Sequence, residues 1–65
     1  MEIKKIREAR GMRQYELANR MGVKQASVSA WESGRAMPSA ENLVKLADIL
    51  ECTVDALLGR APASA

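Results

Sequence analysis

The chain has 65 residues, enough for one domain, and its 48% of hydrophobic residues include no Phe, one Trp and one Tyr. Its net charge of +2 is unevenly distributed, because residues 1–35 carry eight basic and four acidic side chains, whereas residues 36–65 carry two basic and four acidic ones. The lone Cys52 excludes an internal disulfide and fits a reducing, cytoplasmic setting, the absence of His disfavours a metal site, and no apolar run could form a signal peptide or a membrane span.

Apolar residues spaced three to four positions apart predict five short helices, and no alternating run indicates a strand. The predicted helices cover residues 2–10, 14–21 and 25–33, and two more begin at Ser39 and Thr53, which are good N-caps. Turn-forming residues separate them, namely Gly11, Gly22, Gly34, Pro38 and Gly59. The predicted core consists of Ile3, Ile6, Ala9, Leu17, Ala18, Met21, Val28, Trp31, Leu43, Leu46, Ala47, Leu50, Val54, Leu57 and Leu58, with Met12 and Met37 as fillers. We therefore expect one all-α domain over residues 1–60 and a short disordered tail over residues 61–65.

Only Gly22, Val23 and Lys24 join the second and third predicted helices, which fits the tight turn of a helix-turn-helix. If Val28 and Trp31 of the third helix face inward, its opposite face is a stripe of small, uncharged residues. That stripe consists of Ala26, Ser29, Ala30 and Ser33, with Gln25 beside it. Such a slim face can approach another surface closely, and the major groove of DNA admits a helix. The basic half of the chain favours a polyanion as partner, unless its charges only solvate the surface.

In order and spacing, several sequence pieces together resemble the Cro and phage-repressor (XRE-like) type of helix-turn-helix domain, over about residues 3–59. The matching pieces are Ile6-Arg7, Gly11-Met12-Arg13-Gln14, Glu16-Leu17-Ala18, Met21-Gly22-Val23, Val28-Ser29-Ala30-Trp31-Glu32-Ser33-Gly34, Pro38-Ser39 and Leu57-Leu58-Gly59. The resemblance implies a compact five-helix bundle of the lambda-repressor-like DNA-binding type. It also implies a sequence-specific regulator of transcription that binds double-stranded DNA, expected to be a repressor of prokaryotic or phage origin.

The same resemblance implies roles for individual residues. Gln14 is expected to contact phosphate and to brace Gln25, which would read a base, adenine by hydrogen-bond geometry. Arg7 and Glu32 match a buried ion pair between the first and third helices, which we interpret as structural. The other base-facing positions are Ala26, Ser29 and Ala30. The expected contacts to the DNA backbone are Arg13, Gln14, Lys24, Ser27, Ser33 and Arg35.

The chain departs from the family pattern at Arg13 and Lys24, where Ser or Thr usually caps the second and third helices. Our hypothesis is that two caps are exchanged for two phosphate contacts, because cations at a helix start suit phosphate. A second departure is the recognition stripe, in which Ala26 and Ala30 can make no side-chain hydrogen bond. We therefore predict readout by thymine-methyl contacts and by DNA shape, beside the contact from Gln25.

The last two predicted helices carry more apolar residues than one core needs. These residues form a candidate homodimer patch, Val44, Ile49, Ala56 and Leu58, or else they close the core of a monomer. Two units on a two-fold axis would read half-sites about 34–36 Å apart. The alternative function is a protein-interaction module or an antitoxin-type partner with the same fold. A salt-dependent shift of duplex DNA distinguishes the two, because an interaction module would show no steep slope. No paired carboxylates, activated nucleophile or phosphate-cradling loop favours an enzyme, and we expect no cofactor, metal, membrane or small-molecule effector.

Overall fold

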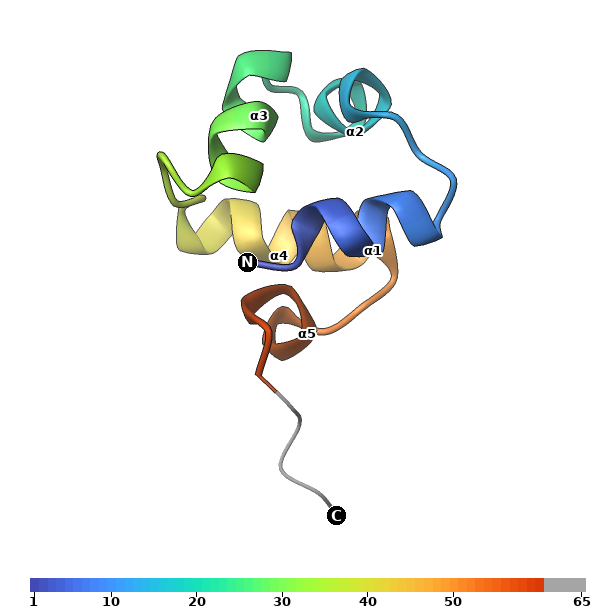
Figure 1. The fold of residues 1–65 in the computed structure, drawn as a ribbon, viewed down its shortest axis with the longest axis vertical. Coiled ribbons are helices and arrows are strands. Elements are labelled where there is room, and N and C mark those ends of the chain that lie inside the picture. Colours follow the sequence, from blue (N-terminus) through green and yellow to red (C-terminus); the bar gives the residue numbers. More distant parts are fainter. Residues whose placement is uncertain (61–65) are drawn as a thin grey trace.

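Residues 1–60 are described by a computed structural model, in which they form five helices and no strand (Figure 1). The helices are α1 (Ile3–Ala9), α2 (Gln14–Met21), α3 (Gln25–Ser33), α4 (Ala40–Leu50) and α5 (Val54–Leu58). The prediction of an all-α, five-helix fold is confirmed, and the bounds of α2 and α3 are those predicted. The tail predicted for residues 61–65 lies outside the described residues. None of the helices in the described part is long and apolar enough to cross a membrane.

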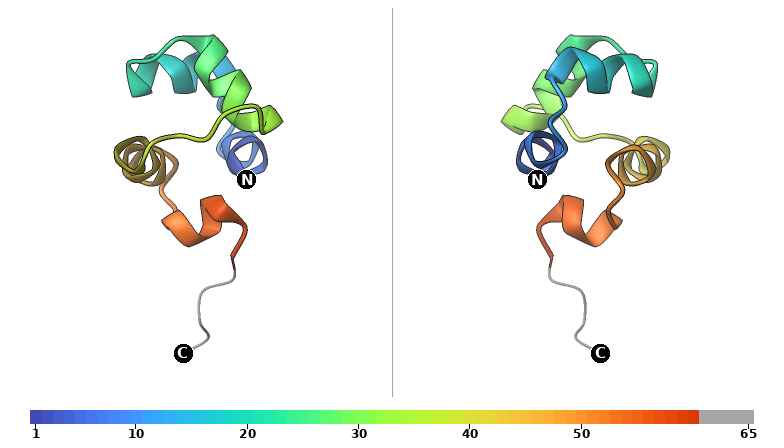
Figure 2. Two further views of the ribbon diagram at one scale, coloured as in Figure 1. Left: turned by 90° about the vertical axis from the view of Figure 1, so that its left-hand side faces the viewer. Right: turned by 90° about the vertical axis from the view of Figure 1, so that its right-hand side faces the viewer.

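The helices are arranged in three levels along the longest axis of the molecule. Figure 1 shows α2 and α3 at one end and α5 at the other, with α1 and α4 between them. Both side views in Figure 2 look along the axes of α1 and α4, so these two helices run in nearly the same direction. The helix-turn-helix segment is therefore at the opposite end of the domain from α5.

The core lies between the helices and is aliphatic except for one indole. Its buried residues are Ile3, Leu17, Ala18, Met21, Val28, Trp31, Leu46, Ala47, Leu50 and Leu57. Five residues predicted to be in the core are only half-buried, namely Ile6, Met12, Leu43, Val54 and Leu58. Met37 is 64% exposed and Ala9 is exposed, so the prediction that they are core residues is wrong. The buried residue of the loop before α4 is Pro38, and Ala9 lies at the rim of a shallow groove between α1 and α5.

Side-chain caps begin the last two helices as predicted. The hydroxyl of Ser39 accepts a hydrogen bond from the backbone N of Asn42 at 3.1 Å, and that of Thr53 accepts one from Ala56 N at 3.0 Å. Each bond satisfies a backbone donor that has no partner within its helix. The two caps position α4 and α5 beneath the helix-turn-helix segment.

The end of α4 is held by Arg10, the residue that follows α1. Arg10 donates from Nε to the carbonyl of Leu50 at 2.8 Å and from Nη2 to that of Glu51 at 3.0 Å. A cation at the C-terminus of a helix also interacts favourably with the helix dipole. The same guanidinium opposes the rise in the pKa of the half-buried Cys52 thiol that burial causes.

Glu51 is the only non-glycine residue with positive φ among the described residues, at 54°. The left-handed conformation costs a residue with a Cβ about 1 kcal/mol, whereas glycine adopts it freely. We therefore expect Glu51→Gly to raise the melting temperature by about 4–8 °C, measured by circular dichroism. The bonds from Arg10 go to main-chain oxygens and would persist in this variant. Glu41→Gly, an exposed site in the first turn of α4, is the control that should lower the melting temperature. A melting temperature of Glu51→Gly at or below that of the parent would contradict the prediction.

Candidate nucleic-acid interface

The connection between α2 and α3 is a tight turn that begins at Gly22. This residue has φ 71° and ψ 30°, the left-handed conformation that favours glycine. Two hydrogen bonds close the turn, from Gly22 N to Asn19 O at 3.2 Å and from Val23 N to Ala18 O at 3.1 Å. The chain can therefore turn sharply within three residues, so that α3 crosses α2 at a large angle (Figure 1).

The two faces of α3 differ in burial as their sequence pattern predicts. Val28 is fully buried and Trp31 is 6% exposed, so the prediction that they face the core is confirmed. Gln25, Ala26 and Ser33 are exposed, while Ser27, Ser29 and Ala30 are half-buried. The loop after α3 folds back on its end, because the carbonyl of Ala30 accepts from Arg35 N at 3.0 Å. The outward residues leave a face without formal charge on a helix that is firmly anchored by its inner side.

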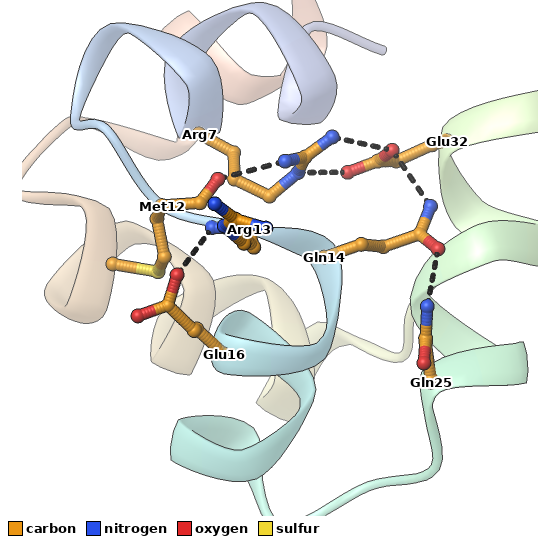
Figure 3. A network of polar contacts seen from close by, with 7 residues as sticks. All are labelled: Arg7, Met12, Arg13, Gln14, Glu16, Gln25 and Glu32. Carbon is orange, nitrogen blue, oxygen red and sulfur yellow. Dashed lines mark hydrogen bonds and ion pairs between the residues drawn. The ribbon is translucent and has the colours of Figure 1, made fainter.

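A buried ion pair joins α1 to α3 (Figure 3). Arg7 donates from Nε to Glu32 Oε2 at 2.7 Å and from Nη2 to Glu32 Oε1 at 3.2 Å. Its Nη1 donates to the carbonyl of Met12 at 2.7 Å, so all three guanidinium nitrogens are engaged. The hydrogen bond to Glu32 raises the pKa of Arg7 above its ordinary value, although burial acts in the opposite direction. The two side chains are only 9% and 6% exposed, and they hold the C-terminal part of α3 against α1.

Two glutamine amides continue this network toward the surface. Gln14 Nε2 donates to Glu32 Oε1 at 3.0 Å, and Gln25 Nε2 donates to Gln14 Oε1 at 3.2 Å. Figure 3 shows the amides in line between the ion pair and the start of α3. The contact between Gln14 and Gln25 is the one that the resemblance implies, but the contact between Gln14 and Glu32 was not predicted. The two residues are 18 positions apart, and nothing in their spacing signals that they meet.

Basic residues lie at the N-termini of α2 and α3. Arg13 and Lys24 both have extended backbone, at φ −83° and −75°, and neither side chain makes a capping bond. A guanidinium or an ammonium has no acceptor atom, so neither group could cap a helix start. Instead Glu16 Oε1 accepts from the backbone N of Arg13 at 2.8 Å, which is one half of a capping box. Neither cation forms an ion pair with any other residue between 1 and 60, so both remain accessible to an anion.

The C-terminal end of α3 carries a small polar cluster. Arg35 Nε donates to Ser33 Oγ at 3.1 Å, and the Ser33 hydroxyl donates to the carbonyl of Ala30 at 3.2 Å. The single hydroxyl proton of Ser33 is thus already engaged within its own helix. Its oxygen holds the Arg35 guanidinium near the exposed face of α3.

The four residues of the candidate dimer patch do not share one face. Val44 is 55% exposed, whereas Ile49, Ala56 and Leu58 are half-buried. Val44 and Ile49 are five residues apart on α4, which separates them by about 140° around the helix axis. Ile49 packs against the edge of the core, and Ala56 lines the groove between α1 and α5.

Nothing in the described part of the chain resembles a metal centre, since no three His, Cys, Asp or Glu side chains there are close enough to hold an ion. Each buried side-chain nitrogen or oxygen of residues 1–60 has a hydrogen-bond partner. The polar groups that are available to another molecule therefore lie at the surface, and those of Arg13, Lys24 and Gln25 are among them.

Comparison with known proteins finds relatives that match nearly all of the described part of the chain. Residues 3–57 match a family model described as helix-turn-helix. The chain is 43% identical over 54 residues to the cryptic phage CTXphi transcriptional repressor RstR of Vibrio cholerae, an alignment that covers 83% of this chain and 48% of the repressor. It is 35% identical over 63 residues to the HTH-type transcriptional regulator AnsR of Bacillus subtilis, covering 92% of this chain and 54% of AnsR.

A third relative is the HTH-type transcriptional activator BcrR of Enterococcus faecalis, which is 30% identical over 57 residues. That alignment covers 88% of this chain and 28% of the activator. The chain thus spans about half the length, or less, of each of these curated relatives. No match was found among solved structures.

Proposed function

The chain belongs to the helix-turn-helix family, of the Cro and phage-repressor type, and on this premise we propose that it is a sequence-specific regulator of transcription that binds double-stranded DNA and acts as a repressor. The observation that carries the proposal is the uncharged, partly exposed outer face of α3. Val28 and Trp31 anchor the inner side of this helix in the core. A helix with such a face fits the major groove. The name of the relative RstR, a phage repressor, supports repression over activation.

In this proposal α3 enters the major groove with Gln25 leading. Gln25, Ala26, Ser29 and Ala30 face the base edges, and the small side chains of the alanines and serine allow contact with thymine methyl groups. The contacts to phosphate come from Arg13, Gln14, Lys24, Ser27 and Arg35. Ser33 takes part by orienting Arg35, because its own proton is engaged by the carbonyl of Ala30. The free cations of Arg13 and Lys24 support this assignment, as does the orientation of Arg35 by Ser33. Backbone N–H groups at the two helix starts add further donors for phosphate.

The proposed active species is a homodimer in the cytoplasm of a bacterium, with half-sites about 34–36 Å apart on the operator. A single small module makes too few contacts to bind tightly at physiological salt, which motivates a dimer. The half-buried Ala56 and Leu58 of α5 support an interface at the end of the domain away from α3, whereas Val44, although exposed, lies on a different face of α4 from Ile49.

Selection of bound duplexes from a random pool tests the function and the symmetry together. We expect a motif of two inverted half-sites, and affinity that falls by about 0.9 logarithmic units per tenfold rise in salt for each phosphate contact. Binding to no duplex, or with no salt dependence, would instead indicate the protein-interaction alternative. An enriched motif without inverted symmetry would reject the homodimer, whereas the proposed binding to a specific DNA sequence would stand.

The exchange of caps for phosphate contacts predicts opposite effects on stability and on DNA affinity. Arg13→Ser and Lys24→Ser each supply a hydroxyl cap, which should stabilise the domain by about 1 kcal/mol and raise its melting temperature by about 4–8 °C. Each should also weaken DNA binding. The slope of the logarithm of affinity against the logarithm of salt concentration should become less steep by the amount that about one phosphate contact per subunit contributes. Thermal melting and anisotropy titrations at several salt concentrations measure the two effects. Lys45→Ser, a cation in the middle of α4, is the control for charge and should leave the slope unchanged. Unaltered affinity of both variants at low salt would refute the exchange.

A further inference from the structure

The hydrogen-bond chain that ends at Gln25 has a fixed direction. Glu32 is the anionic partner of Arg7, and a carboxylate can only accept hydrogen bonds. Gln14 must therefore present its Nε2 to Glu32, at 3.0 Å, which leaves its Oε1 facing Gln25. Gln25 must in turn donate through its own Nε2, at 3.2 Å. Each amide orientation follows from the one before it, and the first follows from the charge of Glu32 (Figure 3).

The origin of this chain is rigid. Arg7 binds both oxygens of Glu32 and is itself tied to the carbonyl of Met12. The carboxylate cannot turn away without leaving the guanidinium unpaired in a site where the Arg7 side chain is only 9% exposed. The order of donors and acceptors that begins at Glu32 in the interior thus determines how the amide of the exposed Gln25, at the start of α3, is oriented.

We propose that Glu32, acting through Gln14, determines which atoms Gln25 presents to a base, and so contributes to sequence selection without touching DNA. This inference rests on the function proposed above. The brace between Gln14 and Gln25 is implied by the family resemblance, but the direction that Glu32 imposes on it is additional. Glu32 is a positioning residue in this scheme, besides stabilising the fold.

The orientation of Gln25 favours one base by its chemistry. One Nε2 hydrogen is engaged by Gln14, so Oε1 and the second Nε2 hydrogen remain for the groove. An acceptor beside a donor matches adenine, which offers the N6 amino group and the N7 acceptor. Guanine offers two acceptors, N7 and O6, and the Oε1 of Gln25 would face them unfavourably. The chain of hydrogen bonds therefore excludes guanine at the position read by Gln25.

Substitutions at Gln14 change the direction of the hydrogen-bond chain but leave the ion pair between Arg7 and Glu32 intact. They therefore test the direction apart from the contribution of the pair to stability. Gln14→Met removes both amide bonds, so Gln25 can turn either way, and the preference for adenine over guanine should fall about tenfold. Gln14→Lys supplies an ammonium that can only donate, both to Glu32 and to the Oε1 of Gln25. This variant should turn the Nε2 of Gln25 toward the groove and shift the preference to guanine.

The test is selection of duplexes by the parent and each variant, followed by affinities for the adenine and guanine versions of the selected site. Gln25→Ala first identifies the base pair that Gln25 reads, as the position that loses its preference. Glu32→Gln, assayed at a temperature at which circular dichroism shows it folded, should lose preference at that same position and at no other.

The outcomes are distinguishable. If the parent protein enriches no sequence, the proposed function fails and this inference fails with it. If the parent enriches a site but guanine occupies the position read by Gln25, the function stands and the inference is overturned. The same holds if Gln14→Met and Gln14→Lys both keep the parent ratio of adenine to guanine affinity.

Discussion

Replacing Glu32 by alanine is expected to lower the free energy of unfolding by about 3–5 kcal/mol. The substitution leaves the guanidinium of Arg7 buried without an anionic partner, since no other carboxylate in the described part of the chain pairs with it. It also removes the acceptor for Gln14 Nε2. A chain of 65 residues has a total stability of about 3–10 kcal/mol, so this loss is a large share of it. Urea denaturation followed by circular dichroism measures it.

The matched control removes both charges at once. Arg7→Met combined with Glu32→Leu replaces the pair with apolar side chains of similar volume and should recover a large part of the loss. Recovery would be incomplete, because the carbonyl of Met12 and the amide of Gln14 each lose a partner. If Glu32→Ala alone costs less than about 1 kcal/mol, the pair behaves as an exposed one and the prediction is wrong.

The largest expected effect on DNA binding comes from a negative charge on the outer face of α3. Ala26→Glu should reduce affinity for the selected site at least about 100-fold, because a carboxylate in the groove meets phosphates and base acceptors at a cost of several kcal/mol. Ala26 is exposed in the first turn of its helix, where a carboxylate interacts favourably with the helix dipole. The melting temperature should therefore stay the same or rise slightly while binding is lost.

The control for this variant carries the same change elsewhere. Ala9→Glu alters the net charge equally, at an exposed site beside the groove that α1 forms with α5. That groove lies toward the end of the domain opposite to α2 and α3 (Figure 1). Affinity of Ala9→Glu is expected within about threefold of the parent, since distant surface charges are screened by salt. Equal losses for Ala9→Glu and Ala26→Glu would contradict the assignment of α3 to the groove.

Local signals in the sequence were sufficient to predict the helices and the faces of α3. Glycines mark the ends of α2 and α3, and apolar spacing identifies the inward positions, because both are properties of neighbouring residues. The burial of Pro38 in place of Met37 was missed, since a loop places its side chains by tertiary packing and has no periodicity. The left-handed Glu51 was missed because no glycine stands at the end of α4, so the residue type gives no sign of this conformation.

The candidate site was predictable where the family resemblance supplied the residue pairs. The resemblance implied two separate contacts, one between Arg7 and Glu32 and one between Gln14 and Gln25. That the two pairs form one continuous chain follows only from the positions of the four side chains in space. Hydrogen-bond direction is a three-dimensional property, and residue types alone do not determine it.

Trp31 gives the domain a built-in fluorophore. It is the only tryptophan in the chain, and its indole is in the core, on the side of α3 away from the face assigned to DNA. Its emission should shift to longer wavelength when the core opens and water reaches the ring. Because the ring has no part in the outer face, the same signal should be nearly silent when a duplex docks. Denaturation can therefore be followed in the presence of operator DNA without a label.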